Sequence, residues 1–447
     1  MLTSVIRRRW TVTNAPRFPV LFPAARRFRG SDAGTTSTST STVANEDDDS
    51  DGYAFASASS RAPTLARAIE ECAKSIRKTL GEKREVMWAH VFVSRGAGYG
   101  EEEAASAGRR TREALSVKGS LVPPTVVGAV TRTCVGGDGE TSDGVSIVAA
   151  SMPGTKVHAF RAESGVMPTL ESGETWTRLV KSQGGSSSST DVVGVMMLAE
   201  TSFEEVDELL ERLHLAMPNS VALGGVVDEG SSLFLNDDVT RRGAVAMMVE
   251  GDFDFETHVA HGARPVGPVM SLTQAHGSAV LELDDAPAHP LLLETLESLP
   301  ETAKTLPVML GLGVRGAKGP FACRDILAVG DGGAVEVASM TLREGVPVQL
   351  HVRDTKWASE QARSVIEKCV SSANEIKDIA KGNSIGAVMF ACGGANRMHA
   401  NNFREQLPSV PLGGAYVRSE IAPLVARGAS SVLSHTNAIG IFRKRRV

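Results

Sequence analysis

The stretch SVALGGVVDEG, residues 220–230, returns almost two hundred residues later as SVPLGGAYVRSE, residues 409–420. Both copies carry Ser-Val-x-Leu-Gly-Gly, and both follow a helix-like segment that ends in proline. Glycines in strands allow one backbone to approach another closely. We interpret the doubled motif as a mark of repeated architecture, in which Leu223 and Leu412 fill equivalent core positions.

Hydrophobic periodicity extends this repeat to three passes through one order of elements. The first pass begins with a helix over 64–80, the second with a strand over 191–200, and the third with a helix over 357–377. In the second pass, the strand-like segments 243–251 and 255–262 are expected to form a pair. The sequence therefore predicts an α+β fold of repeated helix-strand-helix-strand-strand units, with mixed sheets covered by helices.

Composition restricts the function classes. Apolar residues make up 42% of the 447-residue chain, and the longest apolar runs are far shorter than the ~20 residues that span a bilayer. The net charge of -5 argues against a general nucleic-acid binder, which needs a concentrated basic surface. Five cysteines without CxxC spacing indicate reduced thiols. We therefore expect no membrane span, no nucleic-acid partner, no metal and no cofactor.

The N-terminal region has a different character from the rest of the chain. Residues 1–30 carry seven arginines and no acidic residue, which is typical of a transit peptide for the chloroplast or mitochondrion. A merely disordered basic tail is the alternative. The low-complexity segment that follows reads as a linker, with ordered structure beginning near Ala62.

Several long segments, in a fixed order, resemble the FIST family: 224–251, 261–288, 323–354 and 388–423. The resemblance implies a FIST N-like domain over 62–290 and a FIST C-like domain over 291–447, after a transit peptide and linker over 1–61. It also implies a ligand-sensing or protein-docking module. Bacterial members are proposed to bind a small ligand such as an amino acid, whereas in eukaryotic F-box proteins the region recognises substrates of a ubiquitin ligase. No F-box is visible before Ala62.

An amino-acid site needs a guanidinium for the carboxylate, a carboxylate for the ammonium group, and backbone N–H groups from glycine turns. The third pass supplies these groups, with Arg418 and Glu420 two residues apart and hence expected on one face of a strand. The family's arginine after its last cysteine is displaced here to Arg397. The candidate site consists of Cys392, Gly393, Arg397, Arg418, Glu420 and Thr436. Alternatively, the glycines only allow tight packing, and Arg418 and Glu420 form a cross-strand or solvated pair.

Arg264 is the second candidate for ligand binding. It lies in HGARPVG, residues 261–267, where Pro265 and the flanking glycines could present the guanidinium to a cleft. A structural role is equally consistent with the sequence, with Arg264 paired to an acid such as Asp228 or Glu229.

Catalytic and metal-binding interpretations are weaker. GLGVRG at 311–316 matches GxGxxG, but Pro320 leaves no room for the helix that would hold a pyrophosphate. His258 and His261 face opposite ways on a strand and cannot share a metal. Cys392 could act as a nucleophile with His399 or His435 as base. The sequence favours a non-catalytic module that binds a small ligand; a protein-docking adaptor and a cysteine hydrolase are the alternatives.

Overall fold

The computed structural model describes residues 52–445, except 121, 138, 166–191, 315–318, 331, 339–341, 375–383, 393–398 and 426–427. The expected transit peptide lies outside these residues, so the organellar location stays a prediction. Ordered structure begins earlier than expected, because β1 (Ala54–Ser60) is already a strand, with Phe55 completely buried. The small residues of AFASASS resemble a linker in composition, but they pair along their whole length with β6 (Val145–Ser151).

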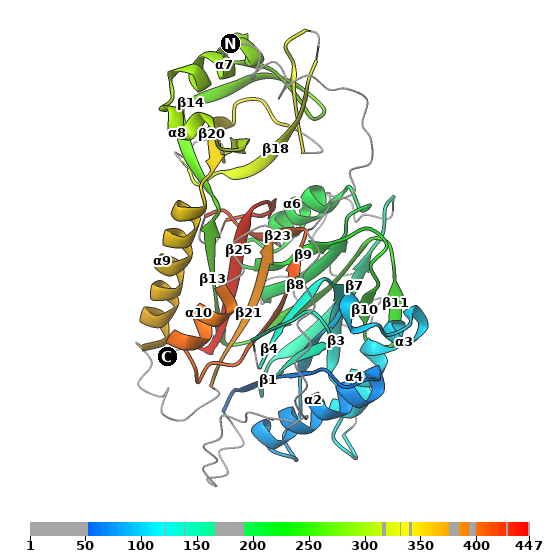
Figure 1. Cartoon of the computed structure of the whole chain (residues 1–447). Coiled ribbons are helices and arrows are strands. Elements are labelled where there is room, and N and C mark those ends of the chain that lie inside the picture. The colour runs from blue at the N-terminus through cyan, green and yellow to red at the C-terminus, as the bar shows by residue number, and fades with distance from the viewer. Residues whose placement is uncertain are drawn as a thin grey trace, which may run out of the picture.

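Three related units form the body of the molecule (Figure 1). The sheet of each unit has two parallel strands at its centre. Next to the first of these lies an antiparallel strand, and beyond that strand lies an outer strand. The first unit contains β1, α2 (Leu65–Leu80), β2 (Trp88–Ser94), α3 (Glu101–Ala105), α4 (Ala107–Leu115), β3 (Thr125–Thr131) and β6. The second contains β7 (Lys156–Ala162), β8 (Val192–Glu200), α6 (Val206–Ala216), β9 (Val221–Val227) and β12 (Ala244–Glu250). The third contains β13 (Phe253–His261), α9 (Thr355–Asn374), β21 (Ile385–Cys392), α10 (His399–Gln406), β22 (Leu412–Val417) and β25 (Thr436–Lys444).

Each unit donates a hairpin to the sheet of another unit. The hairpins are β4 (Thr133–Gly136) with β5 (Gly139–Thr141), β10 (Leu233–Leu235) with β11 (Asp238–Thr240), and β23 (Ser419–Pro423) with β24 (Ser430–Leu433). Strand β4 of the first unit pairs with β22 of the third, β23 of the third pairs with β9 of the second, and β10 of the second pairs with β3 of the first. The exchange is cyclic, so the units form a ring with pseudo-threefold order. The α+β class with mixed sheets covered by helices is confirmed.

A common core lies inside this ring. Its members come from the inner faces of all three sheets and include Trp88, Phe92, Met196, Leu223, Phe390 and Phe442. Separate clusters lie under the outer helices, beneath α2, α6, and α9 with α10. The segment 255–262 was expected to pair within the second unit, and this is wrong. Strand β13 instead pairs with β25 and belongs to the third unit.

One glycine in each unit is required by the parallel pairing. Gly128, Gly224 and Gly414 lie opposite Val91, Met197 and Met389. A Cβ atom on these glycines would lie 1.9, 1.7 and 1.8 Å from the carbonyl oxygens of those partners. The three positions are therefore equivalent, and they show where the central strands approach most closely.

This equivalence corrects the expectation for the doubled motif. The first glycine of SVALGG, Gly224, corresponds to the second glycine of SVPLGG, Gly414, so the two copies are offset by one residue. A one-residue offset turns side chains to opposite faces of a sheet. Leu223 accordingly packs in the common core, whereas Leu412 packs under α9 and α10. The leucines do not fill equivalent positions.

Residues 263–353 form a separate lobe, which leaves the body between β13 and α9 of the third unit (Figure 1). Its strands are β14 (Ala263–His276), β15 (Ala279–Leu283), β16 (Ala286–Pro287), β17 (Val308–Leu312), β18 (Ala322–Val329), β19 (Val335–Val337) and β20 (Pro347–Arg353). Strand β14 pairs with β20 through its first half and with β15 through its second, which closes the sheet into a small barrel. The lobe also carries α7 (Ala288–Ser298) and α8 (Glu301–Lys304). The expected boundary between residues 290 and 291 falls within α7.

The glycine-rich match GLGVRG begins in β17, which pairs antiparallel with the next strand, β18. A dinucleotide fingerprint requires a parallel strand-helix-strand unit. The topology therefore supports the interpretation of this match as coincidental.

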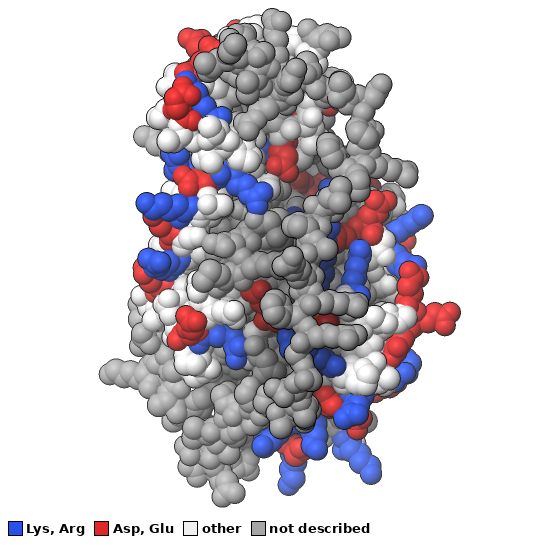
Figure 2. Space-filling model, in the orientation of Figure 1, with Lys and Arg blue, Asp and Glu red and all other residues white. Residues whose placement is uncertain are grey.

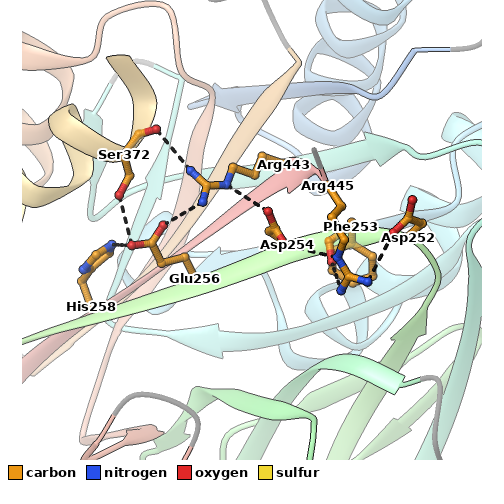
Figure 3. A network of polar contacts seen from close by, with 8 residues as sticks. All are labelled: Asp252, Phe253, Asp254, Glu256, His258, Ser372, Arg443 and Arg445. Carbon is orange, nitrogen blue, oxygen red and sulfur yellow. Dashed lines mark hydrogen bonds and ion pairs between the residues drawn. The ribbon is translucent and has the colours of Figure 1, made fainter. Parts of the chain in front are cut away.

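A polar network holds α9 against the outer strands of the third unit (Figure 3). The carboxylate of Glu256 accepts a hydrogen bond from Ser372 of α9 at 3.0 Å and lies 3.1 Å from Nε2 of His258. Arg443 donates to the carbonyl of Ser372 at 3.2 Å and lies 3.5 Å from carboxylates of Asp254 and Glu256. Arg443 is part of β25, and these contacts pair it with both carboxylates.

Replacing Gly224 by Ala should destabilise the protein by about 3 kcal/mol or more, because the added Cβ meets a backbone carbonyl that cannot move without breaking the parallel pairing. Gly100→Ala is the matched control, since nothing lies within 4 Å of its Cβ position and its φ is -59°. Urea unfolding of both variants measures the difference. Equal stability of the two variants would contradict the close approach.

The hydrogen bond from His258 and the other partners of Glu256 lower the pKa of this carboxyl against the effect of burial. A lowered pKa in the folded state adds stability above the unfolded value of about 4.5, and this stability is lost as the pH falls through the folded value. Glu256→Gln should therefore cost about 1 kcal/mol at pH 7 and less at pH 3. Glu360→Gln, on the exposed face of α9, is the control in urea unfolding at both pH values.

Candidate functional site

The first parallel strand of each unit is β2, β8 or β21, and the carboxyl ends of these three strands are equivalent positions. The residue three positions after the one opposite the required glycine is Ser94 in β2, Glu200 in β8 and Cys392 in β21. Ligands of sheets with parallel strands bind outside the carboxyl ends of those strands. The pseudo-threefold order therefore places three polar side chains at one end of the body, where a binding site is expected.

The strand end of the first unit is closed. The Ser94 hydroxyl lies 3.0 Å from the carbonyl oxygen of Arg132, contacts the carbonyl oxygen of Ser142, and accepts a hydrogen bond from the Gly96 N–H at 3.2 Å. Its side chain is buried, and its donor and acceptor capacity is used within the chain.

The strand end of the second unit is also closed. Glu200 is completely buried, and its Oε1 accepts a hydrogen bond from the backbone N–H of Gly230 at 3.0 Å. Its Oε2 accepts from the backbone N–H of Ser202 at 3.0 Å and from the Ser202 hydroxyl. Both carboxylate oxygens have partners, so this glutamate fixes the turn after β8 and offers no position to a ligand.

The strand end of the third unit differs from the other two. Cys392 is partly exposed, and its thiol donates to the carbonyl oxygen of Arg418 at 3.4 Å. Arg418 corresponds to Arg132, the residue whose carbonyl Ser94 contacts, so the hydrogen bond repeats the one in the first unit. The thiol replaces a buried hydroxyl with a larger and more accessible group.

Glu420 lies beside the backbone of Cys392 and is completely buried. Its Oε2 accepts a hydrogen bond from the Thr436 hydroxyl at 2.6 Å, whereas its Oε1 has no hydrogen-bond partner among the described residues. Burial raises the pKa of this carboxyl well above its usual value, although the Thr436 hydroxyl and nearby backbone N–H groups oppose the shift. The structure thus brings Cys392, Glu420 and Thr436 together, as the sequence analysis predicted.

Arg418 does not share a face with Glu420, and that expectation is wrong. It lies in a bend between β22 and β23, where the chain crosses from one sheet to the next, and its side chain is exposed. The crossing interrupts the alternation on which the prediction depended. Arg418 and Glu420 are therefore neither a common binding pair nor a salt bridge.

Arg264 has a structural partner. Its Nε lies 3.1 Å from Oδ2 of Asp354, and Oδ1 of this aspartate accepts hydrogen bonds from the first backbone N–H groups of α9. The pairing joins the two strands that connect the lobe to the body. Asp228, considered as a partner for Arg264, pairs with Arg132 instead. Gly393 and Arg397 lie outside the described residues, and so does the side chain of His399.

The lobe contributes groups that the sequence analysis did not assign to the site. Asp325 of β18 lies 3.0 Å from Nε2 of His435, which precedes β25. The His435 hydrogen bond lowers the pKa of Asp325, and the positive charges of Arg353 and Arg418 lower it further. Adjacent Arg324 donates to the carbonyl of Val432. No local pattern connects β18 with these residues, because the contacts exist only once the lobe docks on the body.

Several site types lack support in the described part of the chain. No three His, Cys, Asp or Glu side chains gather there as a metal site requires. None of the helices described is both long and apolar enough to cross a membrane. Acidic and basic side chains are interspersed on the described surface seen in Figure 2.

The architecture is that of an α+β protein of three related units around one core, with polar strand ends collected at one end. The FIST N domain matches residues 91–286 and the FIST C domain matches residues 288–423. The chain belongs to the FIST family, whose domains are ligand-sensing domains of signalling proteins.

Other comparisons add little. No curated protein matches the chain. A solved structure of a cyanuric acid hydrolase, described as an innovation by structural concatenation, is similar at 9% identity and a TM-score of 0.32, over 88% of this chain and 100% of the other. Similarity at this level carries no argument about function.

Glu420→Gln tests the state of the buried carboxyl. Because its folded pKa is raised, the folded state holds a proton that the unfolded state releases, so stability should fall as pH rises above about 4.5. The slope is about 1.4 kcal/mol per pH unit until the folded pKa is reached. The glutamine variant should lack this slope, whereas Glu405→Gln on exposed α10 should keep it. Unfolding free energies measured at pH 5 to 8 decide the question; identical profiles would contradict it.

Proposed function

We propose that this protein is a non-catalytic sensory module that binds a small organic ligand at the strand end of the third unit, and that amino acids are the class to test first. The observation that carries the proposal is the difference among three equivalent positions. Ser94 and Glu200 are hydrogen-bonded within the chain, whereas the third unit presents a partly exposed thiol and an exposed guanidinium.

The roles proposed for these groups differ from those expected from the sequence. Arg418 is exposed and can receive a ligand carboxylate. Glu420 is buried and its pKa is raised, so it supports the site from below and does not meet a ligand ammonium group. The lobe lies against the same end of the body through Asp325 and His435. Ligand binding there can change how the lobe is held, which is a means of transmitting a signal.

The hydrolase alternative is less favoured by the geometry. The Cys392 thiol donates to a backbone carbonyl and not to a base. A role as a docking adaptor would instead require a protein partner, and it remains an outcome of the test below.

A thermal-shift screen of the twenty amino acids tests the proposal. A ligand that binds only the folded state at a hundredfold excess over its Kd adds about 2.7 kcal/mol of stability. We expect at least one amino acid to raise Tm, Arg418→Ala to abolish the increase, and Cys392→Ala to retain it. Arg109→Ala, which removes another exposed arginine, in α4, is the control.

Two results would contradict the proposal. The absence of any stabilising amino acid, combined with recovery of one defined protein in pull-downs, would favour the docking adaptor. Covalent labelling of Cys392 by an acylating substrate, with turnover that Cys392→Ala abolishes, would favour the hydrolase.

A further inference from the structure

A second set of equivalent positions lies near the strand ends. In each unit, the chain leaves the second parallel strand for the exchanged hairpin. The residue at this point lies four positions after Gly128, Gly224 or Gly414. These residues are Arg132, Asp228 and Arg418, and we call them the axial ring.

The exchanged hairpins bring the ring residues together. Thr133 pairs with Tyr416 in antiparallel strands. Continuing this register places Arg132 next to Val417, the residue before Arg418. Ser419 pairs with Val226, and the Arg418 N–H donates to the Val226 carbonyl at 2.8 Å, two residues before Asp228.

The centre of this end is closed beneath the ring. The residues that precede the ring members are Thr131, Val227 and Val417, and their exposed fractions are 3%, 1% and 6%. Val227 and Val417 belong to the common core. A ligand at the ring would therefore lie on the end of the body, on the side that the lobe faces.

The ring contains two arginines and one aspartate, and only two of the three are paired. Arg132 binds Asp228 with two hydrogen bonds, of 2.7 and 3.0 Å, in a fork geometry, and the Asp228 side chain is only 16% exposed. The guanidinium of Arg418 makes no hydrogen bond or ion pair with any residue that the structure describes. Two arginines and one aspartate leave the ring itself with one positive charge in excess.

Two acids and one further base lie near Arg418. Asp325 of the lobe is close enough for Arg418 to lower its pKa, but its Oδ1 is paired with His435. Glu420 is buried below the bend. Arg353 adds a second positive charge near Asp325. Near Arg418 the structure thus places one exposed acid, Asp325, and one further base, Arg353.

We propose that the axial ring is the binding site for the carboxylate of a small organic acid or amino acid. Arg418 receives the carboxylate, and the Arg132–Asp228 pair sets the charge of the site by keeping Asp228 away from Arg418. This inference rests on the proposed function for the existence of a small ligand, and it adds the residues and the charge that recognise it.

The test exploits competition for Asp228. Arg132→Ala leaves Arg418 intact but releases Asp228, which should then pair with Arg418 and weaken carboxylate binding at least about tenfold. Asp228→Asn removes the competing charge and should strengthen binding several-fold. The double variant Arg132→Ala/Asp228→Asn should return to within about threefold of the wild type. A merely structural role for the pair would make the double variant no better than the single one.

The probes are L-leucine, 4-methylpentanoate, which lacks the amine, and 3-methylbutylamine, which lacks the carboxylate. Calorimetry with the full chain should show binding of the first two and not of the amine, with Arg109→Ala as the control. If leucine binds and Arg418→Ala abolishes binding, but the Arg132 and Asp228 variants leave affinity unchanged, the ring inference fails while the proposed function stands. If none of the three binds the wild type, the ring inference is rejected; binding of another amino acid in the thermal screen would still support the proposed function.

Discussion

The exchange of one hairpin between neighbouring units is the interaction on which the rest of the structure depends. Strands β4, β10 and β23 each complete the sheet of another unit, so each of these pairings covers a strand edge that would otherwise be exposed. The same exchange closes three sheets around one core of large apolar side chains. It also carries residues from three distant parts of the chain to one end of the body, and both groups of candidate site residues exist only because of it.

Repetition followed by divergence explains why one unit carries the candidate site. Three equivalent strand ends begin from the same geometry, and two are saturated by local hydrogen bonds to Ser94 and Glu200. In the third unit, a thiol and a buried carboxyl replace these arrangements, and the lobe is inserted into the same unit. The site therefore lies where the departure from the repeat and the extra structure coincide. The lobe is held there by contacts such as that between Asp325 and His435.

The predictions that succeeded depend on residues close together in the sequence, whereas those that failed depend on contacts between distant segments. The α+β class and the helices over 64–80 and 357–377 follow from local periodicity, and the structure contains α2 and α9 in these regions. Cys392, Glu420 and Thr436 were grouped from their places at strand ends, and they are in contact. Arg418 was expected to lie on the same strand face as Glu420. The chain bends at Arg418 between two sheets, which leaves Arg418 exposed and Glu420 buried. Arg264 was given the wrong partner, because Asp354 is ninety residues away in the chain.

The sequence by itself determined the family, the repeated units and the segment that carries the candidate site, because all three are written in local patterns of apolar residues, glycines and motif order. Only the tertiary structure decided the one-residue offset between the two Ser-Val-x-Leu-Gly-Gly copies, the cyclic exchange of hairpins and the axial ring. These depend on strand register, and register is set by packing and hydrogen bonding between segments far apart in the chain. A shift of one residue leaves the sequence pattern intact but places Leu223 in the common core and Leu412 on the opposite face of its sheet, under α9 and α10.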